Sequence, residues 1–248
     1  MSLDKKDVAL LIMGPTTTGK TKVARAYAIK HSGEIINGDK FYLYKDFTYS
    51  TGASDNFRGT KSQHHLYQIL DPQDPILSTE EYISFALYAV DEILERGNLP
   101  IAEGCSYKFM SALQEKLKSP SSKMTPVAVG LRWSEGYDLE GAIRKRWKDV
   151  FPFVIKETEA AIRRGLEDSY VMKKGIILIP TAKYLKGELS KEELTEEIVK
   201  NVLEHAHRGL KKFSKIEDIN WIEYNPNDLG QNVSEIEEIL SREGHART

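Results

Sequence analysis

Uninterrupted apolar runs recur along the first half of this chain. The clearest is residues 8–13, VALLIM, which contains no polar residue. A strand that helices cover on both faces has this pattern, as in a parallel sheet. Shorter apolar or alternating segments predict four further strands, at residues 34–37, 99–102, 126–131 and 219–224.

Apolar residues at helical spacing mark the segments between and after these runs. Residues 78–96 are the strongest case, because Ser78 and Glu81 form a capping box and Gly97 ends the helix. The stretch 48–62 is rich in Gly, Ser, Thr, Asn and Asp, which indicates a loop. Alternation of strands and crossover helices predicts an α/β fold in which helices flank a parallel sheet. Further helices are predicted at residues 21–31, 137–167, 191–212 and 234–242.

The chain changes character after its fourth predicted strand. Residues 137–189 are highly charged and mostly helical in pattern, with an apolar patch at 176–180. We expect this segment to form a small helical subdomain. It would sit on an α/β core made by residues 1–136 and 190–248.

Composition is ordinary for a globular protein and limits the partners. Of 248 residues, 40% are hydrophobic and 29% are charged, and the formal net charge of −2 gives no global field to attract nucleic acid. The single cysteine, Cys105, forms no internal disulfide, and residues 1–7 lack the apolar core of a signal peptide. A cytoplasmic location is therefore expected. No apolar run approaches the roughly 20 residues that span a bilayer, so no membrane partner is expected.

Candidate chemistry follows the first predicted strand. Residues 14–21, GPTTTGKT, fit the P-loop pattern G-x-x-x-x-G-K-[ST] between a strand and a helix. Backbone N–H groups and the helix N-terminus bind phosphate oxygens, Lys20 adds a positive charge, and the Thr21 hydroxyl is a ligand for Mg²⁺, the expected cofactor. The predicted fold is therefore P-loop NTPase-like. The residues expected to bind a diphosphate are Gly14, Thr17, Thr18, Gly19, Lys20 and Thr21.

The P-loop by itself leaves a nucleotide kinase or small-molecule kinase open. A kinase of this fold usually has a second carboxylate for its metal, and Glu103 follows the predicted strand 99–102. Such an enzyme also closes an arginine-bearing lid over the phosphates. The candidate lid residues are Arg144, Arg146, Arg163 and Arg164.

Short segments in a fixed order resemble one known family. Besides the P-loop they are INGDK at 36–40, HHL at 64–66, ILDP at 69–72, EGCS at 103–106 and KRW at 145–147. This set resembles the isopentenyltransferase family, which adds a dimethylallyl group to the N6 amine of adenine in free nucleotides or in tRNA. The resemblance is clear over residues 8–113 and patchy but collinear to about residue 224.

The resemblance implies a prenyl transfer rather than phosphoryl transfer. In that family the P-loop holds the diphosphate of dimethylallyl diphosphate in place of ATP. By resemblance, Asp39 takes the proton from the attacking amine, Thr16 stabilises positive charge at the reacting carbon, and Arg146 stabilises the leaving diphosphate. Lys40 and Ser106, with Asp39, are expected to bind the acceptor.

The resemblance leaves the acceptor open. Family members that modify tRNA are usually longer, whereas this chain is short and slightly acidic, which favours a free adenine nucleotide (AMP, ADP or ATP), as in cytokinin biosynthesis. A tRNA adenosine is the alternative. Residues 207–209, HRG, stand where the family often has an RRQ-like run. This departure motivates a third hypothesis, in which the same donor is used with a non-adenine acceptor.

Overall fold

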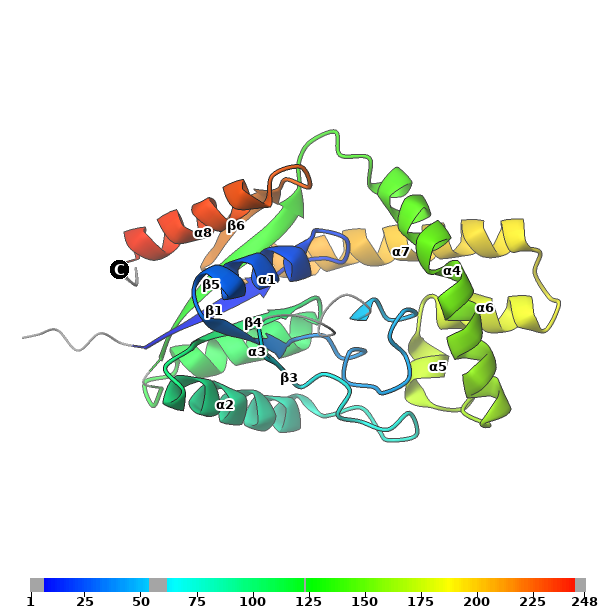
Figure 1. Cartoon of the computed structure of the whole chain (residues 1–248), viewed down its shortest axis with the longest axis horizontal. Coiled ribbons are helices and arrows are strands. Elements are labelled where there is room, and N and C mark those ends of the chain that lie inside the picture. The colour runs from blue at the N-terminus through cyan, green and yellow to red at the C-terminus, as the bar shows by residue number, and fades with distance from the viewer. Residues whose placement is uncertain (1–6, 54–61, 123, 244–248) are drawn as a thin grey trace, which may run out of the picture.

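A sheet of parallel strands forms the centre of the fold. The computed structural model describes residues 7–53, 62–122 and 124–243, and within these ranges a 6-stranded sheet runs in the order β3-β2-β4-β1-β5-β6 (Figure 1). Every neighbouring pair is parallel. The predicted fold, a parallel sheet flanked by helices, is confirmed. The strands are β1 (Asp7–Met13), β2 (Gly33–Asn37), β3 (His64–His65), β4 (Leu99–Gly104), β5 (Met124–Trp133) and β6 (Ile219–Tyr224).

Helices cover both faces of the sheet, which explains the uninterrupted apolar run of β1. Leu10 and Ile12 pack with α1 and α8 on one face, whereas Ala9 and Leu11 pack with α2 and α3 on the other. Figure 1 shows these two layers above and below the sheet. The helices are α1 (Lys20–Lys30), α2 (Thr79–Glu95), α3 (Tyr107–Lys118), α4 (Leu139–Arg163), α5 (Tyr170–Lys174), α6 (Leu178–Leu185), α7 (Lys191–Phe213) and α8 (Leu229–Arg242).

Several elements differ from the sequence expectations. The two-residue strand β3 is too short to carry a pattern, and α3 was not predicted. Helix α8 begins earlier than residue 234, because the Asp228 side chain caps it by accepting from the N–H of Gln231. Of the predicted loop 48–62, residues 54–61 lie outside the described residues, as do residues 1–6 of the N-terminal segment.

A helical group stands at the carboxyl ends of the strands (Figure 1). It contains α4, α5 and α6, together with the first half of α7, which lies beyond the expected segment 137–189. The apolar patch 176–180 contributes Leu178 to this packing. Helix α7 continues to the sheet, where Phe213 joins the core on the α2 and α3 face. In the described ranges no helix is both long and apolar enough to cross a membrane.

A buried carboxylate fixes the outer edge of the sheet. Glu34 of β2 is 2% exposed and accepts two bonds of 2.9 Å from the Arg96 guanidinium. It also accepts 2.6 Å from Asn98 Nδ2 and lies 2.6 Å from His65 Nε2 of β3. Burial alone raises the pKa of Glu34, but these hydrogen bonds outweigh it and lower the pKa to about 2. The carboxylate therefore ties β3 and the end of α2 to the sheet.

We expect Glu34→Gln to lower the free energy of unfolding by about 2 kcal/mol at neutral pH, because it removes the charge-assisted hydrogen bonds from the Arg96 guanidinium, which is itself 36% exposed. The folded-state pKa lies below the ordinary 4.5, so the stabilisation is present above that value and is lost as the pH falls toward 2. Urea unfolding curves of both proteins, followed as the pH is lowered from neutral, measure this difference.

Glu237→Gln is the matched control. The Glu237 carboxylate contacts Lys30 and His31 at the surface of α8 and is 30% exposed. Its loss is expected to cost less than about 1 kcal/mol. Equal losses in the two variants, or a Glu34 effect that does not shrink in acid, would contradict the assignment.

Candidate active site

Gly19 allows a tight turn in the loop between β1 and α1, next to the edge strand β6. Its φ is 69°, in the left-handed region, and a Cβ there would lie 2.1 Å from the Tyr224 ring of β6. The loop therefore turns directly against the last strand before α1 begins. This placement leaves the N-terminus of α1 facing the carboxyl end of the sheet, where phosphate groups bind in such folds.

Lysine 20 brings a positive charge into the loop. Its side chain is 7% exposed, and Nζ donates to the Pro15 carbonyl oxygen at 2.6 Å. Thr18 Oγ1 donates to the same carbonyl at 2.9 Å. Both bonds hold the loop in a closed curve around the ammonium group.

A polar cavity lies in front of this loop. Four of the predicted diphosphate residues line it, whereas Gly14 and the buried Thr18 shape the loop from within. Cationic side chains dominate the charge of the lining, which suits an anion. The lining residues are Thr16, Thr17, Gly19, Lys20, Thr21, Lys22, Arg25, Tyr42, Gly52, Glu103, Gly104, Cys105 and Arg146.

Glutamate 103 is the one carboxylate among these lining residues. It is 1% exposed at the end of β4 and accepts from the Thr21 hydroxyl at 3.2 and 3.3 Å. The Tyr67 hydroxyl donates to its Oε1 at 2.9 Å. Burial raises the pKa of Glu103 above its ordinary value. Hydroxyl and carboxylate oxygens are the donors that Mg²⁺ prefers, so the residues at this point fit such an ion.

Aspartate 39 lies just after β2 and is 5% exposed. Its Oδ1 accepts from the backbone N–H of Phe41 at 2.8 Å, and the thiol of Cys105 donates to its Oδ2. Asn37 braces the turn, with Nδ2 bound to the Asp39 carbonyl and Oδ1 to its N–H. Burial, followed by the charge of Asp39, raises the pKa of the Cys105 thiol, so the thiol stays a hydrogen-bond donor to this carboxylate.

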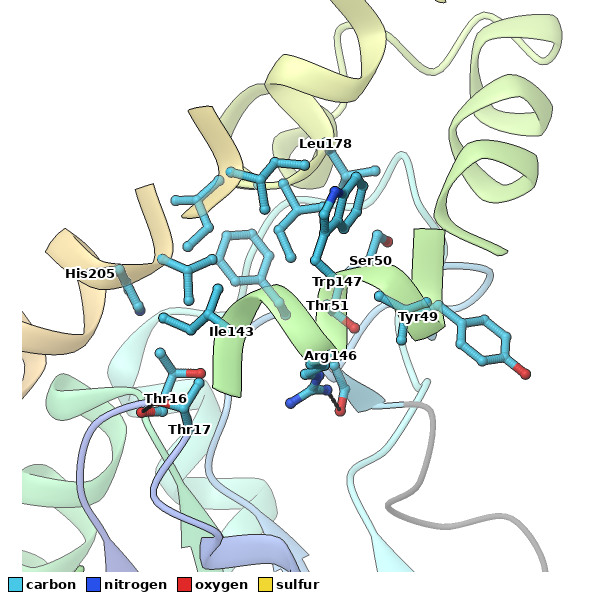
Figure 2. Close-up of a pocket in the computed structure, with 18 of the residues that line it drawn as sticks. Thr16, Thr17, Tyr49, Ser50, Thr51, Ile143, Arg146, Trp147, Leu178 and His205 are labelled. Carbon is cyan, nitrogen blue, oxygen red and sulfur yellow. Dashed lines mark hydrogen bonds between the residues drawn. The ribbon is translucent and has the colours of Figure 1, made fainter. Parts of the chain in front are cut away.

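A second, largely apolar cavity adjoins the polar one (Figure 2). It has an empty volume of about 930 Å³, part of which is open to solvent. Apolar side chains from α4, α6 and α7 form its far wall, and Asp39 and His205 also line it. The wall residues are Ile143, Trp147, Val150, Ile176, Ile177, Leu178, Ile198 and Val202. The residues that line both cavities are Thr16, Thr17, Tyr42, Gly52, Cys105 and Arg146.

The loop that follows Phe47 is clamped onto α4. Glu157 Oε1 accepts from the N–H groups of Thr48 and Tyr49 at 2.9 and 2.7 Å, and Oε2 accepts from Ser50 at 2.9 Å. Arg146 donates to the Gly52 carbonyl at 3.3 Å, a contact drawn in Figure 2. The clamp closes one side of the apolar cavity and fixes Arg146 at the junction of the two cavities.

Two predicted acceptor residues do not line either cavity. The N–H of Lys40 donates to Ser106 Oγ at 2.9 Å, so Ser106 holds the turn after Asp39. The Lys40 ammonium points to the Tyr170 hydroxyl, 3.2 Å away on α5. The contact between α5 and this turn could not be anticipated from the sequence.

Of the four candidate lid arginines, only Arg146 reaches the cavities. Arg144 pairs with Glu140 and Glu196 at the surface, and Arg164 pairs with Asp46. Within the described residues, Arg146 is therefore the one candidate lid arginine that lines the phosphate cavity.

Histidine 205 was missed by sequence reasoning. It lines the apolar cavity from α7, and burial lowers its pKa. Ile198, Val202 and His205 are spaced as i, i+4 and i+7, which places them on one face of a helix. That spacing was the available signal, and it places a polar ring at the end of an apolar stripe.

Comparisons with known proteins identify sequences that are similar to this chain. A family model described as IPP transferase matches residues 42–127. Adenylate isopentenyltransferase 8, chloroplastic, of Arabidopsis thaliana is 35% identical over 137 residues, which cover 54% of this chain and 42% of the plant protein. A tRNA dimethylallyltransferase of Acetivibrio thermocellus is 24% identical over 298 positions, covering 92% of this chain and 95% of the bacterial protein.

Solved structures share the fold over almost the whole chain. A tRNA delta(2)-isopentenylpyrophosphate transferase of Staphylococcus epidermidis matches with a TM-score of 0.83 at 19% identity, covering 96% of this chain and 100% of that one. A eukaryotic dimethylallyltransferase acting on tRNA matches with a TM-score of 0.77 at 15% identity, covering 96% and 80%. The fold and loop thus define a P-loop α/β protein. Residues 42–127 match the IPP transferase family model, and the chain is similar in sequence to isopentenyl- and dimethylallyltransferases.

We expect Lys20→Met to weaken the binding of inorganic diphosphate by roughly 10- to 100-fold. A hydrogen bond to a charged group contributes about 1.5–3 kcal/mol, and about 1.4 kcal/mol corresponds to tenfold in affinity. Isothermal titration calorimetry measures the change. Lys30→Met is the control, because Lys30 lies on the same helix but contacts Glu237 at the surface. Unchanged affinity in Lys20→Met would contradict the role of this loop.

Proposed function

We propose that this protein transfers a dimethylallyl group from dimethylallyl diphosphate to the N6 amine of an adenine. The observation that carries the proposal is the junction of a cationic phosphate cavity with an apolar cavity, where Thr16, Cys105 and Arg146 line both. A diphosphate ester with a short branched hydrocarbon needs these two environments side by side. An apolar cavity next to the P-loop suits such a chain better than the ribose of ATP.

The leaving group is the diphosphate. The bond between the allylic carbon and its oxygen breaks, and negative charge grows on that oxygen. Lys20 and the loop N–H groups stabilise this charge from one side, and Arg146 stabilises it from α4. A Mg²⁺ held at Thr21 would neutralise further charge on the diphosphate.

Asp39 receives the proton of the attacking amine. Its Oδ1 is held by the Phe41 N–H, and the carboxylate lines the apolar cavity beside Thr16. A carboxylate fixed by backbone and thiol donors keeps its orientation while the acceptor approaches. The Thr16 side chain lies at the junction, where its oxygen stabilises positive charge on the allylic carbon.

The adenine of a tRNA is the first candidate acceptor. The relatives whose alignments cover nearly the whole chain, and the solved structures with the same fold, carry names of tRNA-modifying enzymes. This support runs against the free nucleotide that was expected from the sequence.

A free adenine nucleotide is the second candidate, because one observation favours it. The alignment with the Acetivibrio enzyme spans 298 positions, more than the 248 residues of the chain, so that enzyme has segments without a counterpart here. Cytokinin biosynthesis would follow only from this second acceptor.

A transfer assay separates the acceptors. Purified protein is incubated with dimethylallyl diphosphate and Mg²⁺, and with unmodified tRNA, AMP, ADP or ATP in separate reactions. Mass spectrometry is expected to show one added five-carbon unit on tRNA adenosine. Addition only to a nucleotide would select the second candidate, and addition to none of them would overturn the adenine proposal.

We expect Asp39→Asn to lower turnover by roughly 10²- to 10⁴-fold, the usual contribution of a general base. Binding of the donor should be unchanged, because asparagine keeps the size of the side chain and an acceptor oxygen for Phe41. Asp218→Asn is the control, since Asp218 is an exposed carboxylate that pairs with Lys118 just before β6, at the opposite edge of the sheet. Turnover of Asp39→Asn near the wild-type value would show that another group takes the proton.

A further inference from the structure

We propose that Glu157 sets how tightly the polar cavity binds a diphosphate, although its carboxylate is not among the residues that line either cavity. Glu157 is a positioning residue. It anchors residues 48–52, called the 48–52 loop below, and the Gly52 carbonyl of this loop holds the Arg146 guanidinium. The inference rests on the proposed function, in which Arg146 stabilises the leaving diphosphate.

Arg146 and Glu157 lie on the same face of α4. They are about three helical turns apart, so their side chains leave the helix in nearly the same direction. Glu157 contacts the first residues of the 48–52 loop, and Arg146 contacts its last residue, Gly52. One helix face therefore holds the loop at both of its ends.

The carboxylate of Glu157 is the anchor of the loop. Its two oxygens accept from the backbone N–H groups of Thr48, Tyr49 and Ser50 at 2.9, 2.7 and 2.9 Å. The Tyr49 ring also stacks on Phe153 of α4, with ring centroids 4.4 Å apart. Three N–H groups need an acceptor at both oxygens, which a carboxylate provides and an amide does not.

Gly52 passes this order on to Arg146. Nη2 of Arg146 donates to the Gly52 carbonyl at 3.3 Å (Figure 2). A Cβ on Gly52 would lie 2.9 Å from the same Nη2, so the guanidinium packs directly against the loop backbone. This contact uses one N–H of the guanidinium and leaves the others for phosphate oxygens. A long side chain that is already held loses less rotational freedom when the anion binds.

Charge and anchoring predict opposite effects for a substitution of Glu157. An ionised carboxylate repels an anion, so its replacement by a neutral amide would by charge alone tighten diphosphate binding or leave it unchanged. Loss of the anchor releases Gly52 and Arg146 and weakens binding. Weaker binding in Glu157→Gln therefore identifies the positioning role, because the lost charge cannot cause it.

The test is a double-mutant cycle on the binding of inorganic diphosphate, measured by isothermal titration calorimetry. Glu157→Gln is expected to weaken binding by about 3- to 10-fold, because Arg146 then loses rotamer freedom on binding. Arg146→Ala should weaken it by roughly tenfold or more. The double variant should bind as Arg146→Ala does, because Glu157 acts through that guanidinium.

Two further variants make the result specific. Glu159→Gln removes a carboxylate from the same helix that holds none of the three loop N–H groups, and it should bind at least as tightly as the wild type. Gly52→Ala keeps the charge of Glu157 but displaces the guanidinium, so it should weaken binding, and not further once Arg146 is alanine. Thermal melting curves check that each variant is folded, and Gly52→Ala carries the test if Glu157→Gln is not.

Wild-type or tighter binding in a folded Glu157→Gln protein would overturn the proposal. Losses that add in the double variant, or an Arg146→Ala protein with unchanged affinity, would overturn it as well. None of these results depends on prenyl transfer, which the acceptor assay measures separately. If transfer fails while Glu157 and Arg146 are coupled in diphosphate binding, only the proposed reaction is overturned.

Discussion

The ends of β2 and β4 approach each other more closely than side chains would allow. A Cβ on Gly104 would lie 2.2 Å from the carbonyl carbon and oxygen of Gly38, and the Gly38 N–H donates to the Glu103 carbonyl at 2.7 Å. This contact brings Asp39, which follows β2, against Cys105, which follows β4. Since β4 also pairs with β1, the same contact sets Glu103 beside the P-loop. The relative positions of Asp39 and the P-loop therefore depend on two adjacent strands that meet without side chains.

The helical group supplies the apolar wall of the site, which the sheet does not provide. The side of the sheet where the parallel strands have their carboxyl ends is polar, because the P-loop N–H groups, Lys20 and carboxylates lie there. Helices α4, α6 and α7 cover it with an apolar wall and contribute only a few polar groups, among them Arg146 and His205. Glu157 is partly buried where it holds the Thr48–Ser50 backbone, and three N–H donors compensate its desolvation. One partly buried carboxylate on α4 thus closes this side of the cavity.

The sequence was sufficient for elements whose signal is local. The apolar run of β1 predicts a buried strand, and the fixed spacing from Gly14 to Thr21 predicts a phosphate loop, because both depend on neighbouring residues only. Helix α3 was missed although Phe109, Met110, Leu113 and Leu117 have helical spacing. The directions of Lys40 and Arg144 were not predictable, because their partners Tyr170 and Glu196 are distant in sequence. The proximity of Glu103 to Thr21 likewise depends on strand order, which no local pattern contains.

Exclusion of water determines what the arrangement can achieve. In the proposed reaction, the allylic carbon that loses its diphosphate reacts with the nearest nucleophile, and water would give an alcohol instead of a transferred prenyl group. The wall around Trp147 and Leu178 holds no hydrogen-bonding group for water apart from the indole, whose Nε1 donates to Thr195 Oγ1 at 3.2 Å. The side-chain oxygens at the junction belong to Thr16, Thr17 and Tyr42, and the Asp39 carboxylate, which lines the apolar cavity, is already held by Phe41 and Cys105. For the proposed reaction, the arrangement favours an amine that enters beside Asp39, because it replaces water there and contacts the allylic carbon at the same time.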